Sequence, residues 1–219
     1  MPMPWLGSNA TDHKLAIGVP FMPMQIILVR HGETLWSLTG QHTGRTDLAL
    51  TENGEARASR LRPLLQKMRF EHVLTSPLRR ARRTCELAGL GSAARIEPDL
   101  REWDYGDYEG LTTREICASR PGWNVFQDGC PGGESVAQVS QRADRLLAGL
   151  SRLGGNVALF SHGQFLRAVA ARWVGLAVSE GQHLALDTAS VSILGFEQHN
   201  GSIPAICVWN SGSDTASGP

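Results

Sequence analysis

Two histidine-glycine pairs lie directly after apolar segments of this chain. His31 follows residues 26–29 through Arg30, and His162 follows residues 157–160 through one serine. Imidazole acts as a nucleophile and as a proton carrier near neutral pH. The glycine after each histidine allows a ligand to approach the backbone closely. The two pairs therefore indicate a reactive site built around two histidines.

Arginines supply the anion-binding side of this chemistry. The 21 basic residues include only two lysines, Lys14 and Lys67. Arg30 precedes the first histidine, and Arg80 follows a third apolar segment, residues 72–75. A guanidinium binds planar anions through two parallel hydrogen bonds, and the free N–H groups at a helix start also favour an anion. Two imidazoles among arginines favour phosphoryl transfer, in which one imidazole attacks phosphorus.

Other phosphate and hydrolase chemistries lack their motifs in this sequence. It contains no G-x-x-x-x-G-K-[ST], no G-x-G-x-x-G after a strand, no His-Cys-x5-Arg, no D-x-D-x-T and no G-x-S-x-G. The seven histidines have neither H-x-H nor H-E-x-x-H spacing, so we expect no metal site. Equal numbers of acidic and basic residues, 21 each, argue against nucleic acid or an anionic membrane as a partner. No apolar run reaches the ~18 residues of a membrane helix.

Strand-length apolar runs alternate with segments of helical spacing. This alternation predicts an α/β fold with three layers, in which helices cover both faces of a mostly parallel central sheet. Ligands bind at the carboxyl ends of such strands, which would bring the two histidines to one edge. We expect Thr51 and Ser76 to cap helices and Pro63 to kink one. The expected strands are residues 25–29, 72–75, 156–160, 190–196 and 203–209, and the expected helices are residues 52–68, 77–87, 112–119, 134–153 and 164–174.

One folded domain over residues 24–210 accounts for all of these elements. Residues 1–23 show no strand or helix pattern, and we expect them to be a disordered tail or the result of a mis-assigned start codon. Residues 211–219 are expected to form a second disordered tail. The start lacks the charge and apolar pattern of a secretory signal, so we expect a cytoplasmic protein with reduced thiols. The four cysteines, which are far apart and form no CxxC, are Cys85, Cys117, Cys130 and Cys207.

Six motifs between Met24 and Trp209 together resemble those of the histidine phosphatase (phosphoglycerate mutase-like) superfamily. The resemblance implies the phosphoglycerate mutase-like sandwich and neither a metal nor a cofactor. The motifs are Leu28-Val29-Arg30-His31-Gly32-Glu33-Thr34, Thr43-Gly44 with Asp47 and Leu50-Thr51, Ser76-Pro77-Leu78-x-Arg80-Ala81-x-x-Thr84, Leu100-Arg101-Glu102 with Gly106 and Glu109-Gly110, Gly133-Glu134-Ser135, and Ser161-His162-Gly163.

The resemblance assigns a role to each matching residue. His31 is the implied nucleophile, which becomes a phosphohistidine, and Glu102 is the implied proton donor to the leaving oxygen. Two arginines beside His31 would lower its pKa and keep its lone pair available. The implied phosphate pocket is Arg30, Arg80 and His162, and the implied substrate-binding residues are Ser37, Thr43, Gly44, Tyr105 and Gly163.

Several features favour the phosphatase branch of this family. Ser37 occupies a position where many of the mutases have Asn, and the chain is short for a mutase. The stretches 101–110 and 128–135 are similar to those of bacterial acid phosphatases and fungal sedoheptulose-bisphosphatases. We therefore expect a metal-independent phosphomonoesterase that hydrolyses small phosphorylated metabolites, sugar phosphates above all, through a phosphohistidine.

Two other functions stay open at this point. One is a 2,3-bisphosphoglycerate-dependent phosphoglycerate mutase, and the other is a non-catalytic phosphate-binding regulatory module. A homodimer that pairs the C-terminal strands is also open. Four basic residues are candidates for a second anionic group of the substrate, namely His42, Arg45, Arg101 and Arg114.

Overall fold

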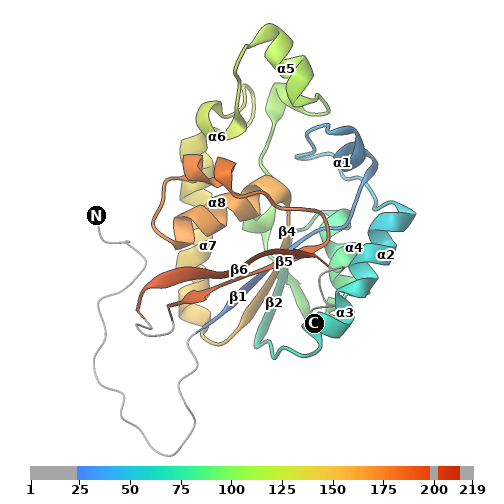
Figure 1. Ribbon diagram of the computed structural model, residues 1–219, viewed down its shortest axis with the longest axis vertical. Coiled ribbons are helices and arrows are strands. Elements are labelled where there is room, and N and C mark those ends of the chain that lie inside the picture. The colour runs from blue at the N-terminus through green and yellow to red at the C-terminus, as the bar shows by residue number, and fades with distance from the viewer. Residues whose placement is uncertain (1–23, 198–201, 213–219) are drawn as a thin grey trace, which may run out of the picture.

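Four neighbouring parallel strands and two antiparallel strands form a six-stranded sheet in the computed structural model, which describes residues 24–197 and 202–212 (Figure 1). The strand order is β3-β2-β4-β1-β5-β6, and β5 runs antiparallel to both β1 and β6. The expected α/β sheet is therefore confirmed, with an antiparallel edge. The strands are β1 (Ile26–Arg30), β2 (His72–Thr75), β3 (Ala94–Ile96), β4 (Val157–Ser161), β5 (Ser190–Phe196) and β6 (Pro204–Gly212).

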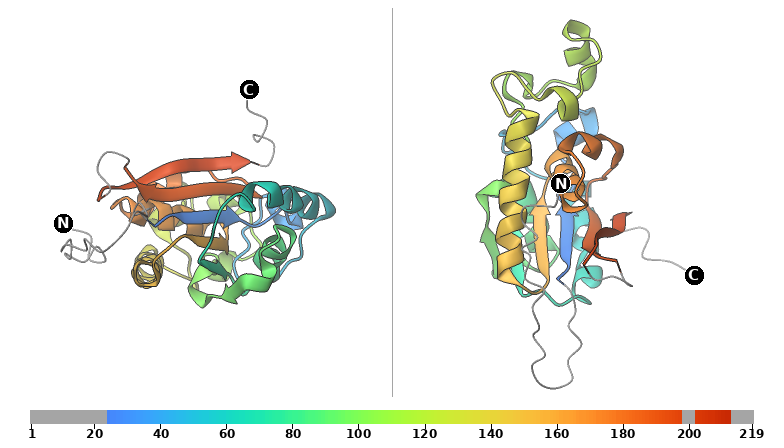
Figure 2. Two further views of the ribbon diagram at one scale, coloured as in Figure 1. Left: turned by 90° about the horizontal axis from the view of Figure 1, so that it is seen from below. Right: turned by 90° about the vertical axis from the view of Figure 1, so that its left-hand side faces the viewer.

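Helices cover both faces of this sheet, as expected (Figure 2). Ile26 and Leu28 of β1 pack in the core shared with α7 and α8, whereas Ile27 and Val29 pack in the core shared with α3 and α4. Successive side chains of a strand point to opposite faces, so a strand between two helical layers is apolar throughout. The helices are α1 (Leu35–Thr39), α2 (Glu52–Arg60), α3 (Arg62–Leu65), α4 (Arg79–Leu87), α5 (Thr113–Ser119), α6 (Val125–Asp128), α7 (Val136–Leu153) and α8 (Gly163–Trp173), and the 3-10 turns are η1 (Gly91–Ala93), η2 (Pro98–Leu100), η3 (Gly106–Tyr108) and η4 (Val178–His183).

Local hydrogen bonds decide where two of the helices begin and end. Thr51 caps α2 as expected, with its hydroxyl accepting from the Gly54 N–H at 2.9 Å. The long helix expected over residues 52–68 divides into α2 and α3 near Pro63, since proline lacks the N–H that would continue the helix.

The start of α4 differs from the prediction. We expected it at Pro77 with Ser76 as cap, but α4 begins at Arg79 after an extended Leu78. Ser76 Oγ accepts from the Leu78 N–H at 3.3 Å, and Asp47 accepts from the Arg79 N–H at 2.7 Å. A carboxylate from another segment thus takes the place of the local cap.

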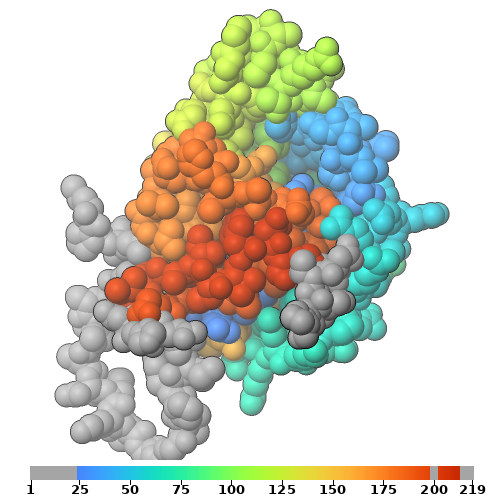
Figure 3. All heavy atoms as spheres, viewed as in Figure 1, coloured from blue at the N-terminus to red at the C-terminus, as the bar shows by residue number. Residues whose placement is uncertain are grey.

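The short helices α1 and α6 and the short strand β3 were not predicted, because they contain too few residues for a periodic pattern. Helices α1, α5 and α6 lie beyond the carboxyl ends of the parallel strands (Figure 1), and Figure 3 shows the α1 and α5–α6 segments on that same end of the surface. Strand β6 reaches Gly212, so residues 211–212 of the expected tail belong to the sheet. The other expected tail residues, 1–23 and 213–219, lie outside the described part. Among the described helices, none has the length and apolar character needed to cross a membrane.

Candidate active site

The two histidines meet because β1 and β4 are neighbours in the sheet. Arg30 pairs in register with Ser161, so the residue after each strand lies at the same edge. The His31 N–H donates to the Ser161 carbonyl at 3.0 Å. The imidazole rings of His31 and His162 have centroids 5.1 Å apart and planes inclined by 60°. The prediction that the sheet brings these two side chains together is therefore confirmed by the geometry.

The tautomer of His31 follows from the hydrogen bond that its ring forms with the backbone. Nδ1 lies 2.7 Å from the Gly32 carbonyl, which can only accept, so Nδ1 carries the hydrogen. The lone pair then lies on Nε2. Burial, followed by the positive charges of Arg80 and Arg30, holds the pKa of His31 well below its ordinary value. A buried, neutral imidazole with its lone pair on Nε2 can act as a nucleophile near neutral pH.

His162 is fully buried and is held by two polar partners. Arg80 Nε donates to its Nδ1 at 3.1 Å, so the hydrogen of the neutral ring lies on Nε2, which donates to Ser76 Oγ at 2.8 Å. Burial and the nearby Arg80 hold the pKa of His162 well below its ordinary value. In this arrangement His162 is a neutral hydrogen-bonding group that fixes the Arg80 side chain.

The guanidinium of Arg80 is fully buried and is held by backbone carbonyls. Its Nη1 donates to Thr46 at 2.8 Å, and its Nη2 donates to Thr43 at 3.0 Å and to Gly44 at 3.1 Å. The carboxylate of Glu109 holds this loop from the other side, because it accepts from the N–H groups of Gly44 at 3.0 Å and Thr46 at 2.9 Å. Glu109 belongs to one of the six motifs, but the sequence assigns it no role, since its partners are more than 60 residues away.

Arg30 lies against the start of α8. One of its Nη atoms donates to the Leu186 carbonyl, while its Nε is buried and has no hydrogen-bond partner within the described segments. A Cβ atom on Gly163 would lie 3.2 Å from the Arg30 guanidinium carbon, so glycine lets the two approach. Burial lowers the pKa of both Arg30 and Arg80. Neither arginine forms an ion pair with a described carboxylate, which leaves their positive charge available to an anion.

The Glu102 carboxylate is held at the amino end of α8. Its oxygens accept from the backbone N–H groups of Trp103 at 2.9 Å, Gln164 at 3.0 Å and Phe165 at 2.9 Å. The side chain is 8% exposed and lines the cavity that also contains His31. It is the negatively charged group that most strongly affects both arginines. This position allows proton exchange with a ligand held beside His31.

A cavity of about 190 Å³ forms in front of these groups. Arg80 and His162 are fully buried and do not line this cavity, so the predicted phosphate pocket is only partly on its wall. Gly44 lies on a different, larger cavity, and its N–H is occupied by Glu109. Ser37 lines the catalytic cavity, but its hydroxyl caps α1 through Thr34. The predicted site residues on the wall of this cavity are Arg30, His31, Ser37, Thr43, Glu102, Tyr105 and Gly163.

The sequence missed several polar residues on this wall. Arg167 donates to the carbonyls of Gly181 at 2.9 Å and Gln182 at 2.8 Å and to the Gln164 amide. Arg167, Gln164 and His42 also line an adjoining cavity of about 220 Å³ beside α6. Burial lowers the pKa of His42 to about 4 and lowers that of Arg167. Arg167 lies on α8, which His162 precedes, but no local pattern marks Arg167 as a wall residue.

The other basic candidates lie elsewhere. Arg45 is 80% exposed in its side chain and pairs with Asp104 at 2.6 Å. Arg45 and Arg101 both line a cavity of about 640 Å³ on the other side of Glu102. Arg114 is an exposed residue of α5 and lines no cavity described here. His42 is therefore the one of the four candidates that reaches the catalytic cavity.

Comparison with known proteins agrees with this geometry. An acid phosphatase of Mycobacterium tuberculosis is 48% identical over 177 residues, covering 79% of this chain and 87% of the relative. The sedoheptulose 1,7-bisphosphatase of Saccharomyces cerevisiae is 37% identical, covering 74% and 72%. A probable phosphoglycerate mutase of Cronobacter sakazakii is 33% identical, covering 80% and 86%.

A solved structure and a family model give the same assignment. The structure of an open reading frame product from Mycobacterium tuberculosis superimposes with a TM-score of 0.81 at 43% identity, covering 87% of this chain and 98% of the other. The model of the histidine phosphatase superfamily (branch 1) matches residues 26–208. The chain therefore belongs to branch 1 of the histidine phosphatase superfamily and is a phosphoric monoester hydrolase.

Proposed function

We propose that this enzyme hydrolyses small phosphorylated metabolites, sugar phosphates in particular, through a phosphohistidine on His31 and without a metal ion. The observation that carries the proposal is the Nδ1–H contact with the Gly32 carbonyl, which leaves the His31 lone pair on Nε2. Nε2 attacks phosphorus, the N–P bond forms, and the bond from phosphorus to the ester oxygen breaks. The positive charges of Arg30 and Arg80 stabilise the transferred group, whose charge is spread over its oxygens.

Glu102 protonates the departing oxygen in this proposal. In the second step, the Glu102 carboxylate takes a proton from water as that water attacks phosphorus. The N–P bond breaks, inorganic phosphate leaves, and His31 returns to its neutral form.

The test is a screen of the purified enzyme against phosphorylated metabolites, with His31→Ala as the control. We expect turnover of one or more sugar phosphates, a phosphorylated form of the wild-type protein by intact-mass analysis of a rapidly quenched reaction, and loss of both in the variant. Turnover that persists in a folded His31→Ala protein would refute the mechanism. A folded wild-type protein that hydrolyses nothing would instead favour the non-catalytic phosphate-binding module.

The mutase alternative is tested separately. The Cronobacter relative bears the name of a probable phosphoglycerate mutase, and Ser37 here uses its hydroxyl in the cap of α1. We expect 3-phosphoglycerate to be isomerised slowly or not at all, with or without 2,3-bisphosphoglycerate. Efficient isomerisation that depends on the bisphosphate would replace hydrolysis as the main activity.

Arg167 supports a substrate with a second anionic group. Its guanidinium lies where the catalytic cavity meets the adjoining cavity, and within the described segments it forms no ion pair. We expect Arg167→Met to reduce kcat/KM for a sugar bisphosphate about tenfold or more, and to change kcat/KM for the matching monophosphate less than about threefold. Equal losses on both substrates would show that Arg167 does not bind the second group.

We also propose that the enzyme works in the cytoplasm with no nucleic-acid partner. All four cysteines are free thiols, as is usual in a reducing compartment. Fractionation of cells that express the tagged protein would test this, and recovery outside the cytoplasmic fraction would refute it.

A further inference from the structure

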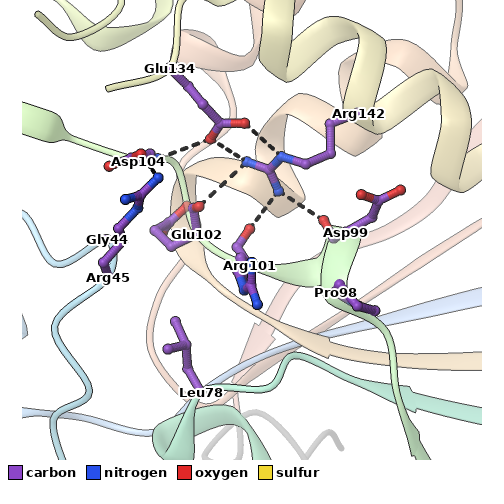
Figure 4. Close-up of a pocket in the computed structure, with 10 residues that line it drawn as sticks. All are labelled: Gly44, Arg45, Leu78, Pro98, Asp99, Arg101, Glu102, Asp104, Glu134 and Arg142. Atoms are coloured by element: carbon purple, nitrogen blue, oxygen red, sulfur yellow. Dashed lines mark hydrogen bonds and ion pairs between the residues drawn. The ribbon is translucent and has the colours of Figure 1, made fainter. Parts of the chain in front are cut away.

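Arg142 and Glu134 form an ion pair on the wall of the 640 Å³ cavity that Glu102 also lines. Two parallel contacts, at 2.9 and 2.7 Å, join the guanidinium to the carboxylate (Figure 4). The Arg142 side chain is 10% exposed and that of Glu134 is 21% exposed. Neither residue lines the catalytic cavity, so neither can touch a substrate bound there.

This ion pair holds the backbone of the segment that carries Glu102. Arg142 Nη1 donates to the carbonyls of Asp99 at 2.8 Å and Arg101 at 2.7 Å, and Nη2 lies 3.4 Å from the carbonyl of Glu102 itself. Glu134 accepts from the Asp104 N–H at 3.0 Å. Residues on both sides of Glu102 are therefore attached to one rigid, bidentate pair, as Figure 4 shows.

The same guanidinium also contacts the helix that binds the Glu102 side chain. It lies over the Phe165 ring, 3.9 Å from the ring centroid. The Phe165 N–H donates to Glu102 Oε1 at 2.9 Å. Arg142 thus packs against both structures that determine where the carboxylate lies, its own backbone and the amino end of α8.

We propose that Arg142, together with Glu134, is a positioning residue that holds Glu102 in place for proton donation to the leaving group. The inference rests on the proposed function, in which Glu102 is the acid. Proton transfer requires hydrogen-bond distance between acid and leaving oxygen, so a small displacement of the loop slows this step. Attack of His31 on phosphorus does not depend on the distance between Glu102 and the leaving oxygen.

The readout is the dependence of the rate on the leaving group. An aryl phosphate with a strongly acidic phenol, such as 2,4-dinitrophenyl phosphate, leaves without a proton, whereas an alkyl phosphate such as glycerol 1-phosphate needs one. A general acid contributes about 100-fold to 10,000-fold to rate. We expect Glu102→Gln to lose about 100-fold or more on the alkyl ester, and Arg142→Ala about tenfold to 100-fold. Both variants are expected to lose less than about threefold in the rate of the first step with the dinitrophenyl ester, measured as the pre-steady-state release of dinitrophenolate. The second step, in which Glu102 acts as base, is common to both esters and does not enter this comparison.

Arg145→Ala is the matched control. Arg145 lies on the same helix and pairs with Asp99 of the same loop, at 2.8 Å, but its side chain is 61% exposed. We expect it to behave as wild type on both esters. An Arg142→Lys variant keeps the charge opposite Glu134 in case Arg142→Ala fails to fold. A single ammonium cannot reproduce the bidentate pair and the carbonyl contacts, so the alkyl-specific loss should persist.

The acid role of Glu102 and the positioning role of Arg142 are refuted by different results. Glu102→Gln without any dependence on the leaving group would refute Glu102 as the acid, and with it the proposed function. If Glu102→Gln shows that dependence while folded Arg142 variants lose activity equally on both esters, or lose none, the positioning role alone is refuted. Added guanidinium can enter through the 640 Å³ cavity that Arg142 lines. If it restores the activity of Arg142→Ala on the alkyl ester, the positioning role is supported directly. If it fails to do so at every concentration that leaves the wild type active, the result counts against that role.

Discussion

The buried state of His31 predicts how the stability of the protein depends on pH. In the folded chain its pKa lies well below the ordinary value of 6.5, because of burial and then because of Arg80 and Arg30. In the unfolded chain the same ring titrates near that ordinary value. Below this value the unfolded state binds a proton that the folded state does not bind. The contribution of His31 to stability is therefore complete above about pH 6.5 and is lost as the pH falls toward the folded pKa.

The size of this loss follows from linkage. Each unit of pH below 6.5 costs about 1.4 kcal/mol for one such histidine, provided that the folded pKa lies lower still. At about pH 5 the loss is about 2 kcal/mol relative to pH 8. His31→Asn removes the titrating ring, while the Asn amide can donate to the Gly32 carbonyl as Nδ1 does in the wild type. The free energy of unfolding of the wild type should therefore fall by about 2 kcal/mol more than that of the variant.

Urea unfolding followed by tryptophan fluorescence measures this difference at the two pH values. Buffers free of phosphate are required, because an anion bound to the folded state would add its own stabilisation. Carboxylates titrate equally in both proteins and cancel in the comparison. Parallel pH dependences for the two proteins, within about 0.5 kcal/mol, would refute the assignment of a strongly lowered pKa to His31.

Two further substitutions test the support of the phosphate pocket. Glu109→Ala removes the carboxylate that holds the Gly44 loop, so we expect Arg80 to lose its fixed carbonyl partners. In steady-state assays, kcat/KM for an aryl phosphate should then fall about tenfold or more. An unchanged kcat/KM in a folded variant would contradict this role of Glu109. Gly163→Ala places a methyl group 3.2 Å from the Arg30 guanidinium carbon. Displacement of Arg30 should weaken competitive inhibition by inorganic phosphate about threefold to tenfold. An unaltered inhibition constant would show that Arg30 accommodates the methyl group without loss of phosphate binding.

The sequence predicted the parts of this site that depend on strand order. The first four residues of β1 and of β4 are apolar, a histidine-glycine pair follows each strand, and neighbouring parallel strands place such pairs at one edge. The short helix α1 was missed, because its five residues have no periodicity and its capping box, Thr34 with Ser37, repeats a serine-threonine pattern common in loops. The start of α4 was wrong because Asp47, from a distant segment, provides the acceptor.

The missed site residues share a different physical cause. Glu109 acts on a loop that lies 65 residues earlier in the chain, and Arg142 holds carbonyls more than 40 residues earlier. Each is a charged side chain whose partners are backbone groups, and any residue type can offer a carbonyl or an N–H. No residue-type pattern therefore marks these contacts, and only the folded arrangement identifies them.

The backbone partners of the two pocket arginines also bear on which ligands the site accepts. Carbonyl groups of residues 43, 44, 46 and 186 satisfy several donors of Arg80 and Arg30, but a carbonyl carries no net charge. The two guanidinium groups are thus fixed in place without being neutralised, and the nearby Glu102 offsets at most one of the two charges. When Glu102 carries the proton that it donates in the proposed mechanism, it offsets neither charge. A dianion then restores electrical balance in this buried site, whereas a monoanion leaves one positive charge uncompensated. Tetrahedral dianions such as inorganic phosphate should therefore bind more tightly than monoanions of similar size, and the site should favour monoesters over diesters, since a phosphodiester carries only one negative charge.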